Sequence, residues 1–301
     1  MRVLKTPPGE VLDLTFSPDG RAIVAAVGGA GVFLWNLDSP TIAPVRLDDD
    51  MMNYFGGLSF SASGRQVWWR AHDGETAYDR DSRTTSRESR SAPMLTFSAD
   101  RTRAISVVGI PDYALRGWQF KEEEWIRQWQ ISTRDLSTQS VTLAPAGDRF
   151  VMLTRFTDSA QWWKQPMRLE VRDAATSVEL ASGTYPYSYA AELCFHPHGE
   201  QIAGINGMTL LTWALPEGGD PRRIQNDNRK HFTAFAYHPK GHLLFVTSND
   251  ETVHVFDTHS LNRVTRYTWQ LDKLSTVAVS PDGTLAAAGS ATGDVVVWDL
   301  D

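Results

Sequence analysis

The stretch STVAVSPDGTLAAAGSATGDVVVWD, at residues 275–299, carries the pattern that decides the fold of this chain. Its centre is the tetrad SPDG at 280–283, which lies between two runs of small apolar and β-branched residues. In such a tetrad proline presets φ, aspartate bonds the backbone of the turn, and glycine accepts a positive φ. A third apolar run, VVVWD at 295–299, ends in an aromatic residue followed by an acid. The stretch therefore predicts three successive strands, with a tight turn between the first two.

Seven related turns follow one another along the chain. They read LTFSPDG (14–20), LSFSASG (58–64), LTFSADR (95–101), VTLAPAG (141–147), LCFHPHG (193–199), FAYHPKG (235–241) and VAVSPDG (277–283). Each turn is followed by an apolar run that ends at an aromatic residue, except in the fourth copy, where Arg172 takes that position. The aromatic residues are Trp35, Tyr78, Trp118, Trp213, Phe256 and Trp298. Such self-similarity predicts one supersecondary unit that is copied seven times.

The spacing between the copies is regular. The last turn residue and the end of the following run lie 14–17 residues apart in six copies and 25 residues apart in the fourth. From that point to the next turn residue the distance is 23–29 residues. Joining the two ends of the chain would give 23 residues, which falls within the same range. The repeats are therefore expected to close into a circle.

This pattern resembles the WD-repeat β-propeller family, in which a repeat of about 40–45 residues forms a four-stranded blade. The resemblance covers the whole chain. It implies an all-β fold of about 28 strands: a single seven-bladed β-propeller domain of four-stranded antiparallel blades over residues 1–301. No sequence remains after residues 295–299 for a fourth strand in the last blade. The N-terminal segment at residues 2–6 is expected to supply that strand and to close the ring.

Typical members of the family share a buried hydrogen-bond network, and this chain departs from it. The family's network joins a Gly-His pair, a serine, an aspartate and the tryptophan at the strand end. Only Ser248 and Asp250 match the serine and aspartate together, and in their repeat Phe256 replaces the tryptophan. The nearest upstream imidazole, on His231, lies outside the usual register. Stability is therefore expected to depend on apolar packing between blades.

Composition excludes several classes of protein. With 42% hydrophobic and 22% charged residues among 301, the chain reads as globular rather than disordered. No run approaches the roughly 18 apolar residues of a membrane span, and the first residues lack the apolar core of a secretory signal. We therefore expect a cytoplasmic location and no membrane partner. The net charge of −7 argues against nucleic acid as a partner.

The sequence offers no catalytic, metal-binding or cofactor-binding residues. His196-Pro197-His198 and His238-Pro239 occupy turns in which other repeats have Ser-Pro-Asp, so we interpret them as turn residues. Cys194 is the only cysteine, which excludes an intrachain disulfide and thiol-rich metal sites. No phosphate-binding loop or nucleophile motif is present. The arginines between residues 80 and 103 are interpreted as a solvated outer strand, because acids are interspersed among them.

One group of aromatic residues is a candidate binding surface. The fourth repeat carries an insert, TDSAQWWKQP at 157–166, flanked by Arg155 and Arg168. In a propeller the connections that hold these aromatic residues emerge on the same face, and exposed aromatic clusters typically mark interaction sites. The predicted surface consists of Trp162, Trp163, Tyr185, Tyr187, Tyr189 and Tyr113. The alternative is that these rings only brace the long loop.

The leading functional hypothesis is a non-enzymatic scaffold that binds a protein or peptide partner, as a monomer or within a larger complex. It rests in part on analogy with the family. An alternative is an enzyme or small-molecule binder that uses the central channel, but Asp13 and Glu192 are the only acids in the first strands of the repeats. A third possibility is a self-assembling or fusion module whose partner domain lies elsewhere.

Overall fold

The computed structural model describes the chain except residues 40–42, 49–55, 72–73, 89–93, 109–112, 123, 134–135, 157–165, 187–191, 216–218 and 301. The described residues form 28 strands, which build seven four-stranded antiparallel sheets, and none of them lies in a helix. The expected number and type of strands are therefore confirmed. We call the sheets blades 1–7, and their strands a–d in the order in which they pair. The described part has no helix that could cross a membrane.

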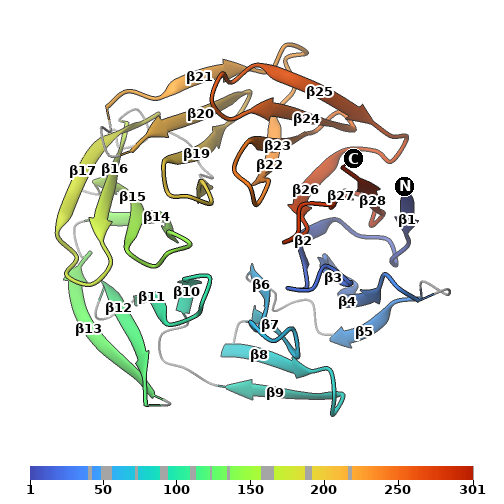
Figure 1. Cartoon of the computed structure of the whole chain (residues 1–301), viewed down its shortest axis with the longest axis horizontal. Helices are drawn as coiled ribbons and strands as arrows, with labels where there is room; N and C mark the ends of the chain where they lie inside the picture. Colours follow the sequence, from blue (N-terminus) through green and yellow to red (C-terminus); the bar gives the residue numbers. More distant parts are fainter. Residues whose placement is uncertain are drawn as a thin grey trace. The chain divides into compact units, whose positions relative to one another are not determined.

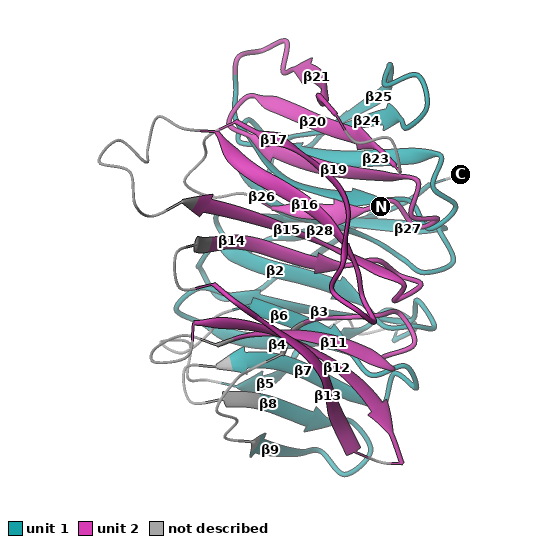
Figure 2. Ribbon diagram, turned by 90° about the vertical axis from the view of Figure 1, so that its left-hand side faces the viewer, with its two compact units in different colours: residues 1–90, 230–301 teal, residues 91–229 magenta. Residues whose placement is uncertain are grey.

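The chain divides into two compact units, which are coloured separately in Figure 2. Residues 1–90 and 230–301 form unit 1, which holds blades 1, 2, 6 and 7. Its strands are β1 (Arg2–Leu4), β2 (Val11–Phe16), β3 (Ala22–Val27), β4 (Gly31–Asn36), β5 (Val45–Asp48), β6 (Gly56–Phe60), β7 (Gln66–Ala71), β8 (Gly74–Asp79), β9 (Thr84–Glu88), β22 (Phe232–Tyr237), β23 (Leu243–Ser248), β24 (Thr252–Asp257), β25 (Arg263–Thr268), β26 (Leu274–Val279), β27 (Leu285–Ser290) and β28 (Val295–Asp299).

Residues 91–229 form unit 2, which holds blades 3, 4 and 5. Its strands are β10 (Met94–Phe97), β11 (Arg103–Val108), β12 (Ala114–Lys121), β13 (Glu124–Ser132), β14 (Leu136–Leu143), β15 (Arg149–Phe156), β16 (Met167–Asp173), β17 (Glu179–Tyr185), β18 (Leu193–Phe195), β19 (Gln201–Asn206), β20 (Thr209–Ala214) and β21 (Arg222–Gln225). Within each unit the four strands of a blade follow one another along the chain, apart from those of blade 7 (Figure 1).

The middle strands of a blade are buried on both faces, which explains their runs of apolar residues. β3 is buried at all six positions, and β24 is buried at five of six. The fourth strands differ, because β25 alternates between exposed and half-buried positions over its second half. A strand covered on both faces reads as a continuous apolar run, whereas a strand covered on one face alternates. The core therefore lies between neighbouring blades of the same unit.

The repeated turns are held together by the residues that made them recognisable. Ser17 Oγ accepts a hydrogen bond from the N–H of Ala22 at 2.9 Å and donates one to Asp19 Oδ1 at 2.5 Å. Blade 7 repeats this arrangement with Ser280 and Asp282, whose oxygens lie 2.6 Å apart. Hydrogen bonds to their carboxylates, above all those from the serine hydroxyls, lower the pKa of Asp19 and of Asp282. In blades 1, 3 and 7 the turn signal in the sequence is thus a small, locally hydrogen-bonded unit of serine and aspartate.

The last blade is completed by the N-terminal strand, as expected. β1 pairs antiparallel with β28, with Arg2 opposite Val297 and Leu4 opposite Val295. Figure 1 shows β1 beside β28, with the two chain ends close to each other. Leu4 is completely buried in the core between blades 7 and 1. After β1, Thr6 Oγ1 donates a hydrogen bond to the carbonyl of Gly293 at 2.6 Å.

Most of the tryptophans at the ends of the third strands lack the hydrogen bond that the family's polar network would give them. Trp35, Trp213 and Trp298 are buried, and the indole N–H of each has no hydrogen-bond partner among the described residues. Trp118 differs, because its indole N–H donates to Ser106 Oγ at 2.9 Å. A buried donor without a partner is unfavourable by about 1–3 kcal/mol. Apolar packing of these rings must outweigh that term, as the sequence indicated.

Blade 4 replaces the aromatic residue with an ion network. Arg172 Nε donates to Glu170 Oε2 at 2.6 Å, and Arg168 Nε lies 2.9 Å from Glu170 Oε1. The Glu170 side chain is almost completely buried. A second carboxylate, on Glu179 of the neighbouring strand β17, pairs with Arg168 at 2.8 Å. The buried carboxylate is thereby neutralised by two guanidinium groups, which is what its burial requires.

Candidate functional site

The predicted aromatic surface is only partly within the described residues. Trp162, Trp163, Tyr187 and Tyr189 lie outside them. Tyr113 and Tyr185 are described, and the structure places them in different environments.

Tyr185 is a core residue, which corrects its assignment to the binding surface. It is the last residue of β17, opposite Met167 of β16, and its side chain is completely buried. The ring stacks on Trp213 of blade 5 with centroids 5.5 Å apart, and the hydroxyl donates to the carbonyl of Ile205. Burial raises the pKa of the hydroxyl. In this position the ring cannot touch a partner, so Tyr185 braces blades 4 and 5.

Tyr113 remains available at the surface. It lies just before β12, its side chain is 39% exposed, and its φ is +39°. Its carbonyl accepts a hydrogen bond from the N–H of Thr133 at 2.6 Å. A left-handed backbone at a bulky residue is unfavourable by about 1–3 kcal/mol and is often found at functional sites. Tyr113 is thus the one described member of the predicted surface that presents an aromatic ring to solvent.

The two turn histidines occupy the position that serine holds in other blades, and each accepts a backbone N–H within its own turn. Nδ1 of His196 accepts the N–H of His198 at 3.2 Å, and Nδ1 of His238 accepts the N–H of Lys240 at 3.1 Å. Both side chains are buried. Their interpretation as turn residues is therefore confirmed, and the described residues contain no group of three side chains able to hold a metal ion.

His238 also joins two blades, and its hydrogen bond within the turn is sensitive to pH. Its Nε2 lies 3.1 Å from the carbonyl of Gly283 in the turn of blade 7, so the neutral ring that carries its proton on Nε2 satisfies both nitrogens. Burial lowers the pKa of His238 from its ordinary value of 6.5, and the neighbouring His242 and Lys240 lower it further. Protonation of Nδ1 removes the acceptor for the N–H of Lys240, whereas Nε2–H still donates to Gly283. The stability contributed by the neutral ring is therefore present above pH 6.5 and is lost as the pH falls through the lowered pKa.

We expect the melting temperature of the wild-type chain to fall between pH 7.5 and pH 5, and the variant His238→Ser to lose most of that dependence. Serine occupies the same turn position in blades 1 and 7, where it accepts the N–H five residues later, so the variant is compatible with the turn. Carboxylates whose pKa is lowered from 3.8 change their contribution to stability only at lower pH, outside the range from pH 7.5 to pH 5. His259→Ser, at an exposed position, is the control. An equal slope in all three chains would contradict the assignment.

Cys194 has no nucleophilic character in this structure. Burial raises the pKa of its thiol to about 12, and the charge of Glu192 contributes to the increase. The thiol donates a weak hydrogen bond to the carbonyl of Phe195 at 3.3 Å. A reactive cysteine requires a lowered pKa, so Cys194 is a small packing residue.

Two acids that the sequence marked, Asp13 in a first strand and Asp250 in the residual network, make structural hydrogen bonds. Asp13 Oδ2 accepts the N–H of Leu58 at 3.2 Å and so links blades 1 and 2. Asp250 is half-buried and accepts a hydrogen bond from Thr252, whose hydroxyl lies 3.2 Å from His254 Nε2. His231 takes part through its backbone, since its carbonyl accepts from Ser248 Oγ at 3.2 Å. The network in blade 6 therefore uses His254, which the sequence pattern did not identify.

The arginines after blade 2 are largely engaged with neighbouring side chains. The guanidinium of Arg80 lies 5.8 Å from the ring centroid of Phe60, and that of Arg101 lies 4.8 Å from the ring centroid of Phe97. Such cation–π contacts are typical of arginine at a packed surface. They support the interpretation of a solvated strand rather than a nucleic-acid interface.

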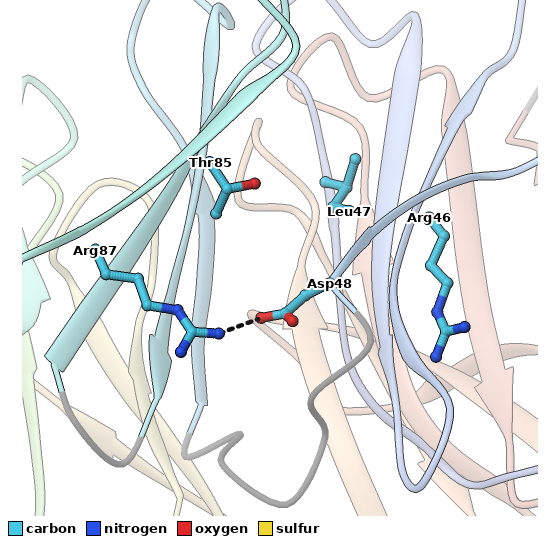
Figure 3. Close-up of a pocket in the computed structure, with 5 residues that line it drawn as sticks. All are labelled: Arg46, Leu47, Asp48, Thr85 and Arg87. Atoms are coloured by element: carbon cyan, nitrogen blue, oxygen red, sulfur yellow. Dashed lines mark ion pairs between the residues drawn. The ribbon is translucent and has the colours of Figure 1, made fainter.

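A cavity that sequence reasoning missed lies between the fourth strands of blades 1 and 2, both in unit 1 (Figure 3). Its volume is about 460 Å³. We call it the arginine pocket, and its lining residues are Arg46, Leu47, Asp48, Thr85 and Arg87. Asp48 is the first of three successive aspartates, and Arg87 lies among the arginines between residues 80 and 103. Only the positions of β5 and β9 in their blades reveal that the two side chains meet.

Comparison with known proteins agrees with this architecture. Residues 221–257 and 263–299 match the family model described as WD domain, G-beta repeat. The chain is 19% identical over 295 residues to the transcriptional corepressor LEUNIG_HOMOLOG of Arabidopsis thaliana, a match that covers 98% of this chain and 36% of that protein. The chain thus spans about a third of the length of that relative.

A solved structure shows the same fold at low sequence identity. The crystal structure of the β-propeller domain of Myceliophteria thermophila Cps50 (Swd1) matches with a TM-score of 0.72 and 15% identity, covering 99% of each chain. Together with the seven four-stranded sheets, this match defines the fold as a seven-bladed β-propeller and confirms the predicted fold class. The two segments that match the WD-repeat family model hold strands β21–β24 and β25–β28, so the resemblance to that family is carried by two of the seven repeats.

Proposed function

We propose that this chain is a non-enzymatic scaffold that binds a protein or peptide partner. The observation that carries the proposal is the way in which the fold uses its chemically competent side chains. His196 and His238 hold turns, Cys194 is kept as a thiol, and Asp13 links two blades. Because these four side chains of the described part serve the structure itself, we favour a role in binding over one in catalysis.

The relationship to known proteins supports the same conclusion. The relative named above is described as a transcriptional corepressor, and its matched segment is about a third of its length. A propeller that forms part of a longer protein is typically an interaction module. We extend this role to the present chain as a proposal, with the partner defined only as a protein or peptide.

We further propose that the partner binds at the aromatic surface, now without Tyr185. The remaining members are Trp162, Trp163, Tyr187, Tyr189 and Tyr113. Tyrosine and tryptophan are the side chains most enriched among interface hot spots. The insert is the only large departure from a regular repeat length, and surface connections are where a rigid scaffold usually carries function.

The double variant Trp162→Ala with Tyr187→Ala is expected to abolish capture of the main partner from a lysate of the native host, with nearly unchanged melting temperature. A single hot-spot truncation can weaken binding by about 2 kcal/mol or more. Mass spectrometry of the captured proteins measures the effect. The matched control is Val178→Ala with Leu180→Ala, two exposed apolar side chains at the edge of blade 4. A double variant that melts several degrees lower and still captures its partner would make the aromatic residues a brace.

A further inference from the structure

The fourth strand of blade 3, β13, offers the longest open edge among the fourth strands. It has nine residues, whereas the other fourth strands have three to seven. It lies at the end of its sheet, and no strand of the described part pairs with its outer side (Figure 1). An edge strand of this length presents a row of backbone donors and acceptors with which another strand can pair.

The ladder between β12 and β13 shows which backbone groups face the open edge. Phe120 of β12 donates its N–H to the carbonyl of Thr102, on the side of β11, at 2.8 Å. The backbone groups of Phe120 therefore face away from β13, and those of Trp125, the residue opposite it, face away from β12. The same holds for Arg127, opposite Trp118, because the backbone direction repeats at every second residue. The N–H and C=O groups of Trp125 and Arg127 thus point to the open side.

The side chains near this edge are partly exposed. Ile126 is 45% exposed, and Phe120, near the end of β12, is 42% exposed. Trp125 is half-buried, because its ring packs on Phe120 with centroids 5.2 Å apart and on Phe97 with centroids 5.9 Å apart. The Arg127 side chain is exposed. The edge therefore combines open backbone groups with apolar side chains that another chain could cover.

The residues of β13 favour a second copy of the same strand as the partner. Two copies that pair antiparallel are related by a twofold axis through one residue, because paired residues point to the same face of the sheet. An axis through Glu124 or Arg127 would place like charges opposite each other, which is unfavourable. An axis through Trp125 would place the apolar Ile126 opposite Glu124. Beyond Arg127 a bulge interrupts the strand, so Ile126 is the position that avoids these conflicts.

An axis through Ile126 gives each of the central residues a suitable neighbour. The exposed Ile126 side chain meets its own copy, and Trp125 lies opposite Arg127 of the second copy. A guanidinium group beside an aromatic ring is a favourable contact. Each Trp125–Arg127 pair can also exchange both of its N–H···O=C hydrogen bonds, because the backbone groups of both residues face the open side.

We propose that the chain forms a homodimer by antiparallel pairing of β13 with β13 of a second copy, centred on Ile126. One short stretch of each chain takes part, which is typical of a weak interface and predicts a dimer that dissociates on dilution. The pairing goes beyond the scaffold function, which does not require it. It would give each assembly two copies of the partner-binding site and so allow bivalent binding.

Sedimentation velocity of the full chain over a series of concentrations measures the dimer. We expect the average sedimentation coefficient to rise toward that of a dimer as the concentration increases. Ile126→Lys places two like charges opposite each other on the axis and should weaken dimerisation by about tenfold or more. Its melting temperature should stay unchanged, because Ile126 is 45% exposed. The control, Leu180→Lys, introduces the same charge at a position that is 56% exposed on β17 and should leave the dimer intact.

A disulfide bond tests the register. Ile126 directs its backbone groups to β12, so it and its copy would form a non-hydrogen-bonded pair with Cα atoms about 4.5 Å apart. That distance lies within the range of about 4.4–6.8 Å that a disulfide spans. Ile126→Cys should therefore form a covalent dimer with oxidised glutathione, whereas Leu180→Cys should not. The native thiol of Cys194 does not interfere, because burial raises its pKa to about 12.

Several outcomes would overturn the assignment. They are a chain that stays monomeric at every concentration, a dimer that Ile126→Lys leaves unchanged, and equal crosslinking of the two cysteine variants. If the chain stays monomeric and Ile126→Lys abolishes capture of the host partner, the edge binds a strand of that partner and the second copy is the wrong occupant. If the chain stays monomeric and capture is unaffected, the pairing fails and the scaffold function stands.

Discussion

A chain without residues 1–8 is expected to melt about 10 °C or more below the full-length protein. The deletion removes β1 and its pairing with β28, and it uncovers the core position filled by Leu4. Burial of one leucine contributes about 1.5–3 kcal/mol, and each lost hydrogen bond adds about 0.5–1.5 kcal/mol. The contacts of Lys5 with Asp294 and of Thr6 with Gly293 are lost as well. A loss of about 5 kcal/mol converts to this shift at the 2–4 °C per kcal/mol typical of domains of 150–250 residues.

Point variants distinguish the loss of the contacts made by β1 from a nonspecific effect of truncation. Leu4→Ala should destabilise the chain by about 2–5 kcal/mol, because its side chain is completely buried. Val3→Ala, at a neighbouring position that is 40% exposed, should change stability by no more than about 0.5 kcal/mol. Melting curves of the truncated and substituted chains provide the measurement. Coincident curves for truncated and full-length protein would mean that blade 7 does not need its fourth strand.

Replacing Gly117 with alanine is expected to destabilise the chain by about 3 kcal/mol or more. A Cβ atom at this position would lie 2.1 Å from Cε2 of Trp129, the residue opposite it on β13. Trp129 has little freedom to move, because its ring stacks on Phe150 of blade 4 with centroids 5.2 Å apart. Its indole N–H also donates to the carbonyl of Ala174 at 2.9 Å. Overpacking of this kind typically costs about 1–3 kcal/mol, and the displaced tryptophan adds the loss of its own contacts.

A double variant identifies the clash as the cause. In the background Trp129→Leu the effect of Gly117→Ala should shrink to well under half, since residues in contact show non-additive free energies. Gly207→Ala is the comparison, because its Cβ would meet nothing within 4 Å and only its φ of +57° opposes the change. Urea unfolding of the wild type, the two single variants, the double variant and Gly207→Ala gives the free energies. Equal effects of Gly117→Ala in both backgrounds would rule out the ring as its origin.

Much of the fold could be predicted because its signals are local and repeated. A serine, an aspartate and a glycine that together form a hydrogen-bonded turn leave the same trace in the sequence each time, as Ser17 and Ser280 show. The pairing of the N-terminal strand was also predictable, because regular spacing left blade 7 one strand short. Its residues 2–4 pair with 295–297, within the expected ranges.

The candidate sites were less predictable because non-local contacts decide them. Tyr185 looked like part of a connection, yet its pairing with Met167 and its stacking on Trp213 extend β17 to include it. Asp48 and Arg87 lie 39 positions apart and looked like members of two separate charge clusters. His254 joined the network of blade 6 through a threonine that no family pattern marks. Each of these contacts depends on which strands become neighbours, and local sequence carries no signal for it.

Because β1 pairs with β28, blade 7 can be completed only after residues 295–297 have been synthesised. Arg2 is synthesised 295 positions before its partner Val297. Closing a loop of that length costs about 5 kcal/mol of free energy in lost chain entropy before any contact is gained. Each hairpin within a blade, by contrast, closes over a few residues. Leu4 therefore lacks its buried position throughout most of translation. β1 is thus made long before the strand with which it pairs, and it is among the last strands to reach its place.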